Sequence, residues 1–310
     1  MSKPWLDKRI GVLMGGISRE REISLRTGGA MLKALQEAGY QAQGIDVAAD
    51  FVPRLLAARI EVAVIALHGR WGEDGTIQGL LELLRIPYTG SGVLASALAM
   101  NKIKAKEIFL FHGLPTPEFV CPPEGKEPGE PPFPPPWVVK PASEGSTIGI
   151  AICMDRQGLQ QAVRRAREYD REVLVERFIK GKELTVGILQ GAPLPIIEIV
   201  PKGGFYDYHA KYTPGQTEYI CPAPITKQQE KEIGALGLKA YHALGCSGCA
   251  RVDLFLSEKG EAFVTEVNTL PGMTETSLVP KAAAQKGITF AQLVEIILAE
   301  ASLKIEEGEV

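Results

Sequence analysis

The sequence predicts a mixed fold, with a parallel-sheet α/β unit at the N-terminus and α+β units after it. The chain has 310 residues, a length typical of two or three domains. Three features support this class. The chain opens with a strand, a glycine turn and a helix; a proline-dense connector interrupts its middle; and a two-stranded hairpin lies near its end.

The opening unit combines the apolar strand Arg9–Met14, a Gly-Gly-Ile-Ser turn and a helix from Ser24 to Ala38. It begins a βαβ unit but lacks the GxGxxG spacing of a dinucleotide site. Glu20 stands where a pyrophosphate would lie, which favours a cationic ligand group such as an amine. The alternative is that Glu20 only complements the helix dipole.

A second buried strand, Glu61–Leu67, runs into a polar glycine loop that begins with His68. Ligands of open α/β sheets bind at such carboxyl ends, although a lone histidine is more often structural. Helices are expected over Thr76–Leu84 and, without a break, from Ser91 to His112.

The segment from Cys121 to Pro136 is too rich in proline for a helix or a sheet interior. We expect an exposed connector; the alternative is a recognition tract for a proline-binding partner. The next strand, Trp137–Lys140, ends at Lys140 before a small-residue loop and the strand Ile148–Cys153. Backbone N–H groups of such a loop and Lys140 can hold phosphates, but the loop is also readable as an ordinary hairpin turn.

The rest of the chain alternates strands and helices around one long polar loop. The expected elements are helix Leu159–Tyr169, strands Val173–Glu176, Glu183–Leu189 and Pro195–Val200, the loop from Lys202 to Tyr219, and helices Lys227–Leu244 and Thr289–Ser302. Long loops of this kind are usually lids or binding loops.

The hairpin near the end carries charge on one face. With a turn centred on Lys259-Gly260, strand alternation gives one polar face and one core face. The polar face pairs Arg251 with Asn268, Asp253 with Glu266 and Phe255 with Val264, while Phe263 and Thr265 fall on the core face. Opposed carboxylates repel, and a divalent cation with oxygen ligands such as Mg²⁺ would offset this. The alternative is an ordinary solvated face.

Composition and charge limit the classes of partner expected for this chain. The formal net charge is −3 with no basic tract, which argues against nucleic acid or an anionic membrane as the main partner. No apolar run is long enough to span a bilayer, and the first residues lack a signal-peptide core, so we expect a cytoplasmic protein. Cys246 and Cys249 form a CxxC without a second ligand pair, so we expect reduced, mostly buried thiols; redox chemistry is the alternative.

Several stretches together resemble the D-alanine–D-alanine ligase family of the ATP-grasp superfamily along nearly the whole chain. They are residues 15–24, 67–70, 72–79, 87–92, 139–141 with 144–146, 205–208 with 211–212, 251–253 and 266–274. The resemblance implies a three-domain ATP-grasp fold with domains at 1–94, 95–180 and 181–310. It also implies ATP-dependent joining of two D-alanines through an acyl phosphate for peptidoglycan precursor synthesis, two Mg²⁺ ions with Mn²⁺ as an alternative, and a homodimer.

The resemblance also implies roles for individual residues. Amine and substrate binding falls to Glu20, His68, Ser277 and Leu278, and oxyanion stabilisation to Arg251 and the Gly272 N–H. Nucleotide binding falls to Lys102, Lys140, Glu176, Phe178, Ile179, Glu183 and Lys211. Metal binding falls to Asp253, Glu266 and Asn268, and closure of the site to Ser146 and Tyr212 together with Glu20.

Two positions depart from the family pattern: Asn101 replaces a frequent Asp, and Arg177 a frequent Lys. Tyr212 favours a dipeptide product over D-alanyl-D-lactate. Three other readings stay open: a D-alanine–D-lactate or other ATP-grasp ligase, a non-catalytic nucleotide-binding module, and a kinase that uses the same clamp.

Overall fold

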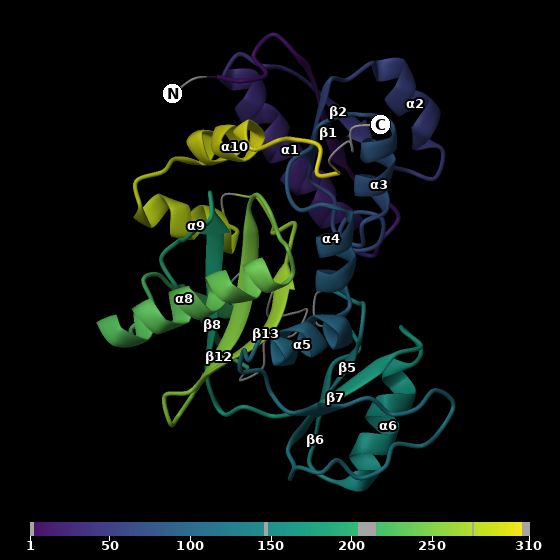
Figure 1. Ribbon diagram of the computed structural model, residues 1–310, viewed down its shortest axis with the longest axis vertical. Helices are drawn as coiled ribbons and strands as arrows, with labels where there is room; N and C mark the ends of the chain where they lie inside the picture. The colour runs from purple at the N-terminus through teal and green to yellow at the C-terminus, as the bar shows by residue number, and fades with distance from the viewer. Residues whose placement is uncertain (1–2, 146–147, 204–214, 275, 306–310) are drawn as a thin grey trace.

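The computed structural model describes residues 3–145, 148–203, 215–274 and 276–305. Its strands form three sheets, each from a different part of the chain. Figure 1 shows the N-terminal sheet at the top, the six-stranded sheet below it, and the four-stranded sheet with its helix at the bottom right.

The N-terminal sheet is parallel, with strand order β2-β1-β3. Its strands are β1 (Arg9–Met14), β2 (Gln41–Asp46) and β3 (Val62–Ile65), and its helices are α1 (Arg21–Glu37), α2 (Phe51–Ala58) and α3 (Thr76–Leu83). The predicted parallel α/β unit is therefore confirmed. The sequence analysis missed β2 and α2, because β2 is a mostly exposed edge strand and α2 is only eight residues long.

The helix expected without a break from Ser91 to His112 is two helices, α4 (Val93–Met100) and α5 (Lys102–Phe111). Asn101 separates them with an extended backbone at ψ 103°. Its side chain accepts hydrogen bonds from the N–H groups of Ile103 and Lys104, which caps α5. The prediction was wrong because apolar periodicity runs through the break, while the cap depends on one polar residue.

The four-stranded sheet is antiparallel, with strand order β4-β7-β5-β6. Its elements are β4 (Phe119–Val120), β5 (Trp137–Pro141), β6 (Ala151–Cys153), α6 (Arg156–Ala166) and β7 (Val173–Arg177). The proline-dense connector contains no helix or strand, as expected.

The six-stranded sheet has the order β11-β10-β8-β12-β13, with β9 beside β8. Its strands are β8 (Gly181–Leu189), β9 (Ala192–Pro193), β10 (Ile197–Pro201), β11 (Thr217–Ile220), β12 (Ala250–Ser257) and β13 (Ala262–Asn268). Helix α8 (Lys227–Ala243) lies across β8, β12 and β13, as Figure 1 shows.

The last two helices, α9 (Leu278–Gln285) and α10 (Phe290–Ala299), turn back towards the N-terminal sheet. Helix α10 packs against α1, and both figures of the whole chain place them side by side. Residues of α1, β1, β3, α9 and α10 share one hydrophobic core. The domain boundaries after residues 94 and 180 stay a prediction.

The hairpin register confirms the pairs that matter for the site and corrects the rest. Arg251 lies opposite Asn268 and Asp253 opposite Glu266, as predicted. Beyond a bulge the register shifts, so Leu254 pairs with Val264 and Phe255 with Phe263. The predicted pairing of Phe255 with Val264 was therefore wrong.

The shift has a local cause at the turn. The Ser257 N–H donates to the Glu261 carbonyl oxygen at 2.8 Å, so the turn lies one residue earlier than predicted. Thr265 absorbs the difference as the bulged residue, and its hydroxyl donates to the Asp253 carbonyl oxygen at 2.9 Å. Val264 consequently lies in the core, and Thr265 lines a cavity instead of packing there.

In the part of the chain that the structure describes, no single helix is long and apolar enough to cross a membrane. Taken together, α9 and α10 would have that length and composition, but they are bent by 105° relative to each other.

Candidate active site

Two cavities meet at the centre of the molecule, between the three sheets. The larger has a volume of about 590 Å³ and the smaller about 340 Å³. Lys102, Glu144 and Glu266 line both. The larger cavity also contains Glu20, His68, Arg251, Asn268, Gly272, Ser277 and Leu278, and the smaller contains Lys140, Glu176, Phe178, Ile179, Glu183 and Asp253. The predicted substrate residues and the predicted nucleotide residues thus lie in adjoining spaces.

Glu20 is a buried carboxylate at the start of α1, directly after the turn that leaves β1. Two glycines let neighbouring backbone come close to it. A Cβ on Gly145 would lie 2.7 Å from Glu20 Oε2, and one on Gly69 would lie 3.2 Å from the same oxygen. The carboxylate is therefore enclosed by the loops that follow β3 and β5, where an amine would meet it inside the larger cavity.

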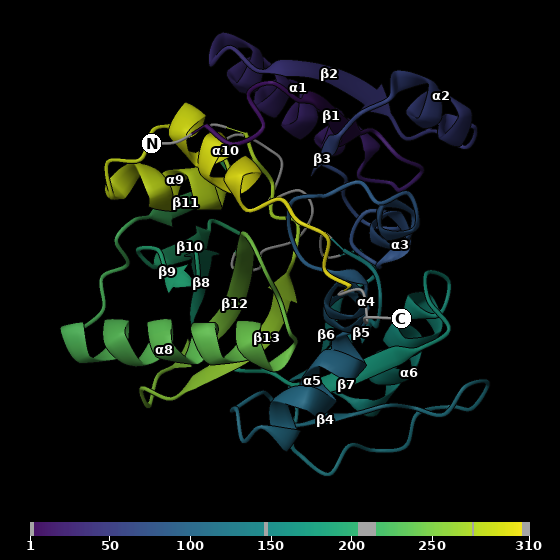
Figure 2. The same cartoon turned by 45° about the horizontal axis from the view of Figure 1, so that its top comes forward.

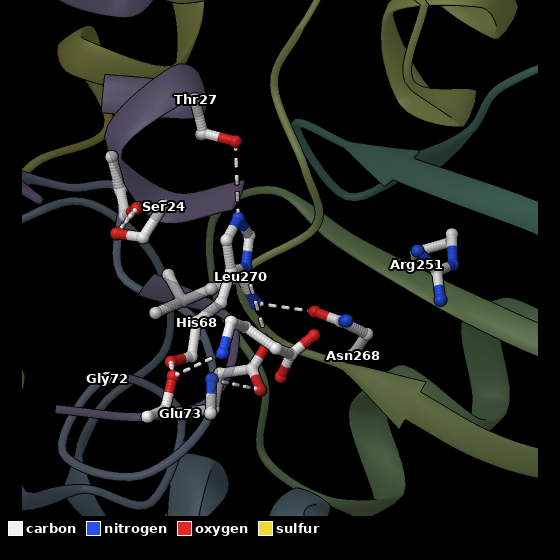
Figure 3. A network of polar contacts seen from close by, with 12 residues as sticks. Ser24, Thr27, His68, Gly72, Glu73, Arg251, Asn268 and Leu270 are labelled. Carbon is white, nitrogen blue, oxygen red and sulfur yellow. Dashed lines mark hydrogen bonds and ion pairs between the residues drawn. The ribbon is translucent and has the colours of Figure 1, made fainter. Parts of the chain in front are cut away.

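His68 lies beside Glu20 at the carboxyl end of β3, and its ring is held from two sides. Figure 3 shows Thr27 above the ring and Glu73 below it. The Thr27 hydroxyl lies 3.2 Å from Nε2, and the Glu73 carboxylate lies 3.8 Å from Nδ1. Glu73 is itself fixed by the Gly69 N–H at 2.9 Å. Sequence reasoning did not single out Glu73, whose place in the Trp-Gly-Glu-Asp-Gly loop after His68 was the available signal.

The polar face of the hairpin is organised around Asp253. The Arg251 guanidinium donates to both carboxylate oxygens, at 2.9 and 2.8 Å, and the Thr185 hydroxyl donates to one of them at 2.6 Å. Glu266 lies opposite on β13, 3.7 Å from the Lys102 ammonium. Arg251, Asp253, Glu266 and Lys102 each line at least one of the two cavities, so charge is concentrated where the cavities join.

Asn268 ends β13 and shapes the segment that follows. Its side-chain oxygen accepts from the Leu270 N–H at 2.9 Å, a contact drawn in Figure 3, where Arg251 lies apart on the neighbouring strand. The chain then passes Gly272 to Ser277, the N-cap residue of α9. The Ser277 hydroxyl accepts from the Thr274 N–H at 3.0 Å. This turn forms the wall of the larger cavity at its α9 end.

Lys102 begins α5 and joins the two cavities. Its ammonium donates to the Glu144 carbonyl oxygen at 2.7 Å and also lies near Glu266. The lysine therefore holds the backbone of the loop that contains Ser146 and faces the hairpin carboxylates at once. A phosphate chain placed here would replace these contacts with stronger charge-assisted ones.

The smaller cavity has a buried cluster of three charges at its inner wall. Glu176 on β7 pairs with Lys140 from β5 through Oε1 and with Lys106 from α5 through Oε2, the latter at 3.1 Å. Burial alone would raise the pKa of Glu176, but the two ammonium groups outweigh it and hold that pKa below its usual range. Burial lowers the pKa of Lys106, against the pull of Glu176. Sequence reasoning missed Lys106.

The other predicted nucleotide residues line the same cavity. Phe178 and Ile179 follow the end of β7, and the Phe178 N–H donates to the Pro136 carbonyl oxygen at 3.1 Å. Glu183 lies on β8 opposite Phe255. Three predicted residues, Ser146, Lys211 and Tyr212, lie outside the described residues.

The donor set on the hairpin fits a hard divalent cation. Asp253, Glu266 and Asn268 offer carboxylate and amide oxygens on one face, where the two carboxylates oppose each other. Within the described ranges, no three His, Cys, Asp or Glu side chains form a complete metal cage. A Mg²⁺ ion here would therefore take further oxygens from phosphates, as this ion commonly does.

Among the described residues, no cysteine lines either of the two cavities. All five lie within the described ranges as free thiols, and Cys246 and Cys249 are buried, as expected. Burial raises the pKa of the Cys246 thiol to about 12, which makes a thiolate role at neutral pH unfavourable.

Comparison with known proteins indicates the family of this chain independently of the site geometry. A family model described as D-ala D-ala ligase C-terminus matches residues 130–299, and one described as D-ala D-ala ligase N-terminus matches residues 51–91. A D-alanine--D-alanine ligase of Syntrophotalea carbinolica is 54% identical over 299 residues, covering 96% of this chain and 97% of that protein. One from Geobacter sulfurreducens is 52% identical over 301 residues, covering 96% and 95%.

Solved structures of the same kind of ligase are also similar to this chain. The crystal structure of D-alanine--D-alanine ligase from Bacillus anthracis complexed with ATP is 36% identical, with a TM-score of 0.82, and the match covers 94% of this chain and 97% of that chain. A second structure of the Bacillus anthracis ligase has a TM-score of 0.83 at 38% identity, with the same coverage. The predicted ATP-grasp fold is thereby confirmed. The chain belongs to the D-alanine–D-alanine ligase family.

Proposed function

We propose that this chain joins two D-alanines into D-alanyl-D-alanine, with ATP converted to ADP and phosphate. The observation that carries the proposal is the junction of the two cavities at Lys102, Glu144 and Glu266. One cavity has an enclosed carboxylate suited to an amine, and the other has lysines suited to phosphates. The dipeptide is a peptidoglycan precursor, and ATP use follows from membership of the family.

The first D-alanine would lie in the larger cavity. Glu20 is suited to its ammonium, since a buried carboxylate gains from a cationic partner. His68, held between Thr27 and Glu73, would lie beside it. This arrangement leaves the substrate carboxylate facing Lys102 and the hairpin, where the γ-phosphate of ATP would arrive.

ATP would occupy the smaller cavity. Lys102 and Lys140 would hold its phosphates, with Lys211 as a third cation from outside the described residues. The adenine edge would meet Glu176 and Ile179, with Phe178 beside them, and Glu183 would take the ribose. A mixed wall of apolar and charged groups suits a base that stacks and a phosphate chain that needs neutralisation.

Asp253, Glu266 and Asn268 are the residues that would hold Mg²⁺, as two ions, with Mn²⁺ as an alternative. When bound, the metal neutralises the phosphate charge and orients the transferred group. Arg251 would then exchange its contact with Asp253 for the developing oxyanion, joined by the Gly272 N–H.

The chemistry takes two steps. An oxygen of the first D-alanine carboxylate forms a bond to the γ-phosphorus while the bond to ADP breaks, which gives an acyl phosphate. The neutral amine of the second D-alanine attacks the acyl carbon, and the tetrahedral intermediate expels phosphate, which leaves with one amine proton, to give the peptide bond. Ser277 and Leu278 would bind the second carboxylate, and Ser146 and Tyr212 would close the site with Glu20, which excludes water.

Two further assignments belong to the same proposal. We infer a homodimer, which the family resemblance implies. We also infer a cytoplasmic location, because the reaction consumes ATP.

The test is ADP formation with Mg-ATP and D-alanine, run beside L-alanine and beside D-alanine plus D-lactate, with products identified by mass. We expect one ADP for each D-alanyl-D-alanine and no product from L-alanine. A depsipeptide as main product would contradict the role given to Tyr212. ATP binding without turnover of any pair would overturn the ligase proposal in favour of a non-catalytic nucleotide-binding module.

A further inference from the structure

Lys106 is a buried cation to which the reaction assigns no task. Its side chain is fully buried in the inner face of α5. Its ammonium lies 2.6 Å from the Thr116 hydroxyl oxygen, 3.1 Å from Glu176 Oε2 and 5.2 Å from the centre of the Phe119 ring. Burying an ammonium group is costly unless nearby groups compensate for it. Its position therefore points to a specific task next to Glu176.

The helix places Lys106 behind the nucleotide cavity. Lys102 and Lys106 are four residues apart on α5, so their side chains share one face, about one turn or 6 Å apart along the axis. Lys102 lies where the two cavities meet. Lys106 lies one turn further on, against the carboxylate of Glu176.

The two lysines on Glu176 are not equivalent. Lys140 lines the cavity and contacts Oε1, and it is one of the cations that phosphates would attract. Lys106 forms an ion pair with Oε2 and does not line the cavity, and that oxygen is buried and accepts no hydrogen bond from the described residues. Bound phosphates that drew Lys140 away would leave Oε1 available to a donor in the cavity, with Lys106 still on Oε2.

The direction of the Lys106 ammonium is itself fixed. The Thr116 hydroxyl donates its proton to the Val264 carbonyl oxygen at 2.8 Å, so it can only accept from Lys106. Val264 lies on β13, two residues before Glu266. Through Thr116, the Lys106 ammonium is therefore linked to β13, the strand that carries Glu266 and Asn268. The same ammonium contacts the Glu176 carboxylate at the inner wall of the smaller cavity.

We propose that Lys106 is a positioning residue for base recognition, which keeps Glu176 charged and turned so that the pocket selects a purine with a 6-amino group over one with a 6-oxo group. This inference rests on the proposed binding of ATP in the smaller cavity. A carboxylate is an acceptor only, so it pairs with the amino group of adenine and is repelled by the oxygen of hypoxanthine. Without Lys106, the buried carboxylate would take up a proton or stay with Lys140, and either change removes the selection.

The experiment compares ATP with inosine triphosphate, which has an oxygen in place of the 6-amino group and a proton on the neighbouring ring nitrogen N1. Dissociation constants for both are measured by calorimetry with Mg²⁺ and without D-alanine, so the readout does not depend on ligation. We expect the wild-type chain to prefer ATP, and K106M to reduce that preference by about tenfold or more, the range for a charge-assisted hydrogen bond. K104M is the matched control, because Lys104 is an exposed lysine on the same helix that pairs with Glu107.

A merely structural role gives a different pattern. K106M would then lower the melting temperature and weaken both nucleotides alike, with the preference unchanged, and that result would overturn the inference. If K106M cannot be purified, K106M/E176Q is compared with E176Q, since neither leaves a lone carboxylate beside the substitution. We expect the preference to differ by less than about twofold between these two, and a further drop of about fivefold would overturn the inference.

A different result would contradict the proposed function. A wild-type chain that binds ATP with the expected preference but forms no dipeptide would contradict the ligase proposal and leave the role of Lys106 intact.

Discussion

Two clusters of charged side chains border the nucleotide cavity, and they differ in how far their carboxylates are buried. On the hairpin, the side chains of Asp253 and Glu266 keep 13% and 32% of their surface exposed and face the space where ligands would arrive. On β7, the side chain of Glu176 is only 4% exposed and contacts two lysines. The hairpin carboxylates also have protein cations nearby, Arg251 on Asp253 and Lys102 near Glu266, but they keep some contact with the cavity, whereas Glu176 depends almost entirely on its two lysines.

The difference separates function from stability. Removing a charge from the hairpin should affect the reaction more than the fold, because the groups left behind face the cavities and keep part of their surface in water. Removing a charge from the buried cluster should affect both, because the partner left behind cannot reach water. Four substitutions of carboxylates or their neighbours test this relation between burial and effect, from the largest expected change to the smallest.

The largest effect is expected for Asp253→Asn. The substitution removes a charged metal ligand, so we expect the rate of ADP formation to fall by about a hundredfold or more, with partial recovery at high Mg²⁺ concentration. The melting temperature should change little. Steady-state kinetics over a range of Mg²⁺ concentrations measures the effect, and Asp50→Asn, at an exposed position, is the control. A variant of full activity would exclude Asp253 as a metal ligand.

Glu20→Gln should have the next largest effect. The amide keeps the shape but loses the charge that pairs with an ammonium, so the KM for the first D-alanine should rise by about tenfold to a hundredfold. Calorimetry should show unchanged affinity for Mg-ATP. Glu22→Gln changes an exposed residue of the same helix and should leave both constants as they are. An unchanged KM in Glu20→Gln would remove the carboxylate from the amine site.

Asn101→Asp is expected to act on stability alone. The Asn101 amide donates to Glu172 Oε2 at 2.8 Å, and an aspartate would place two carboxylates there. The cap of α5 survives, because aspartate accepts from the same N–H groups. We therefore expect urea unfolding to show a loss of about 1 kcal/mol or less. Adding Glu172→Gln should restore the stability, and failure to do so would mean that this pair is not the cause.

The smallest effect concerns Asp46, whose carboxylate receives two hydrogen bonds from Arg21, at 2.7 and 2.6 Å. The guanidinium lowers the pKa of Asp46 below its usual value. A group with a lowered folded-state pKa stabilises the fold above its unfolded pKa of about 4, and this contribution is lost as pH falls through the lower value. The stability difference between wild type and Asp46→Asn should therefore be present at pH 7 and shrink towards pH 3 in urea unfolding. A constant difference would mean that the ion pair does not contribute through its charge.

These particulars also show where sequence reasoning worked. Strand alternation around one glycine turn predicted Asp253 opposite Glu266, and the bulge at Thr265 keeps that pair although the turn is displaced. The amine site at Glu20, predicted from a strand followed by a glycine turn, stays a prediction. Both patterns are local. Backbone geometry sets the two-residue alternation of a strand and the short spacing of a turn, and tertiary packing does not change either.

Other features were out of reach because they depend on the environment. The bulge at Thr265 let the turn slip by one residue and still preserved the pairs that matter, which no period of two can foresee. The break at Asn101 lies inside a continuous apolar pattern. Lys106 resembles any lysine on a helix until β4 and β7 pack against that helix and exclude water from it.

The sequence by itself therefore determined the family, most of the candidate residues and the alternation of the main strands and helices, because local periodicity and short motifs indicate them. It did not indicate β2, α2 or the break at Asn101. Only the tertiary structure decided which charges are buried together. It joined the two cavities at Lys102, turned α10 back onto α1, and placed Lys106 and Lys140 on opposite oxygens of Glu176. The physical reason is that the cost of a charge depends on its distance from water and from other charges, which a chain acquires only when distant segments pack.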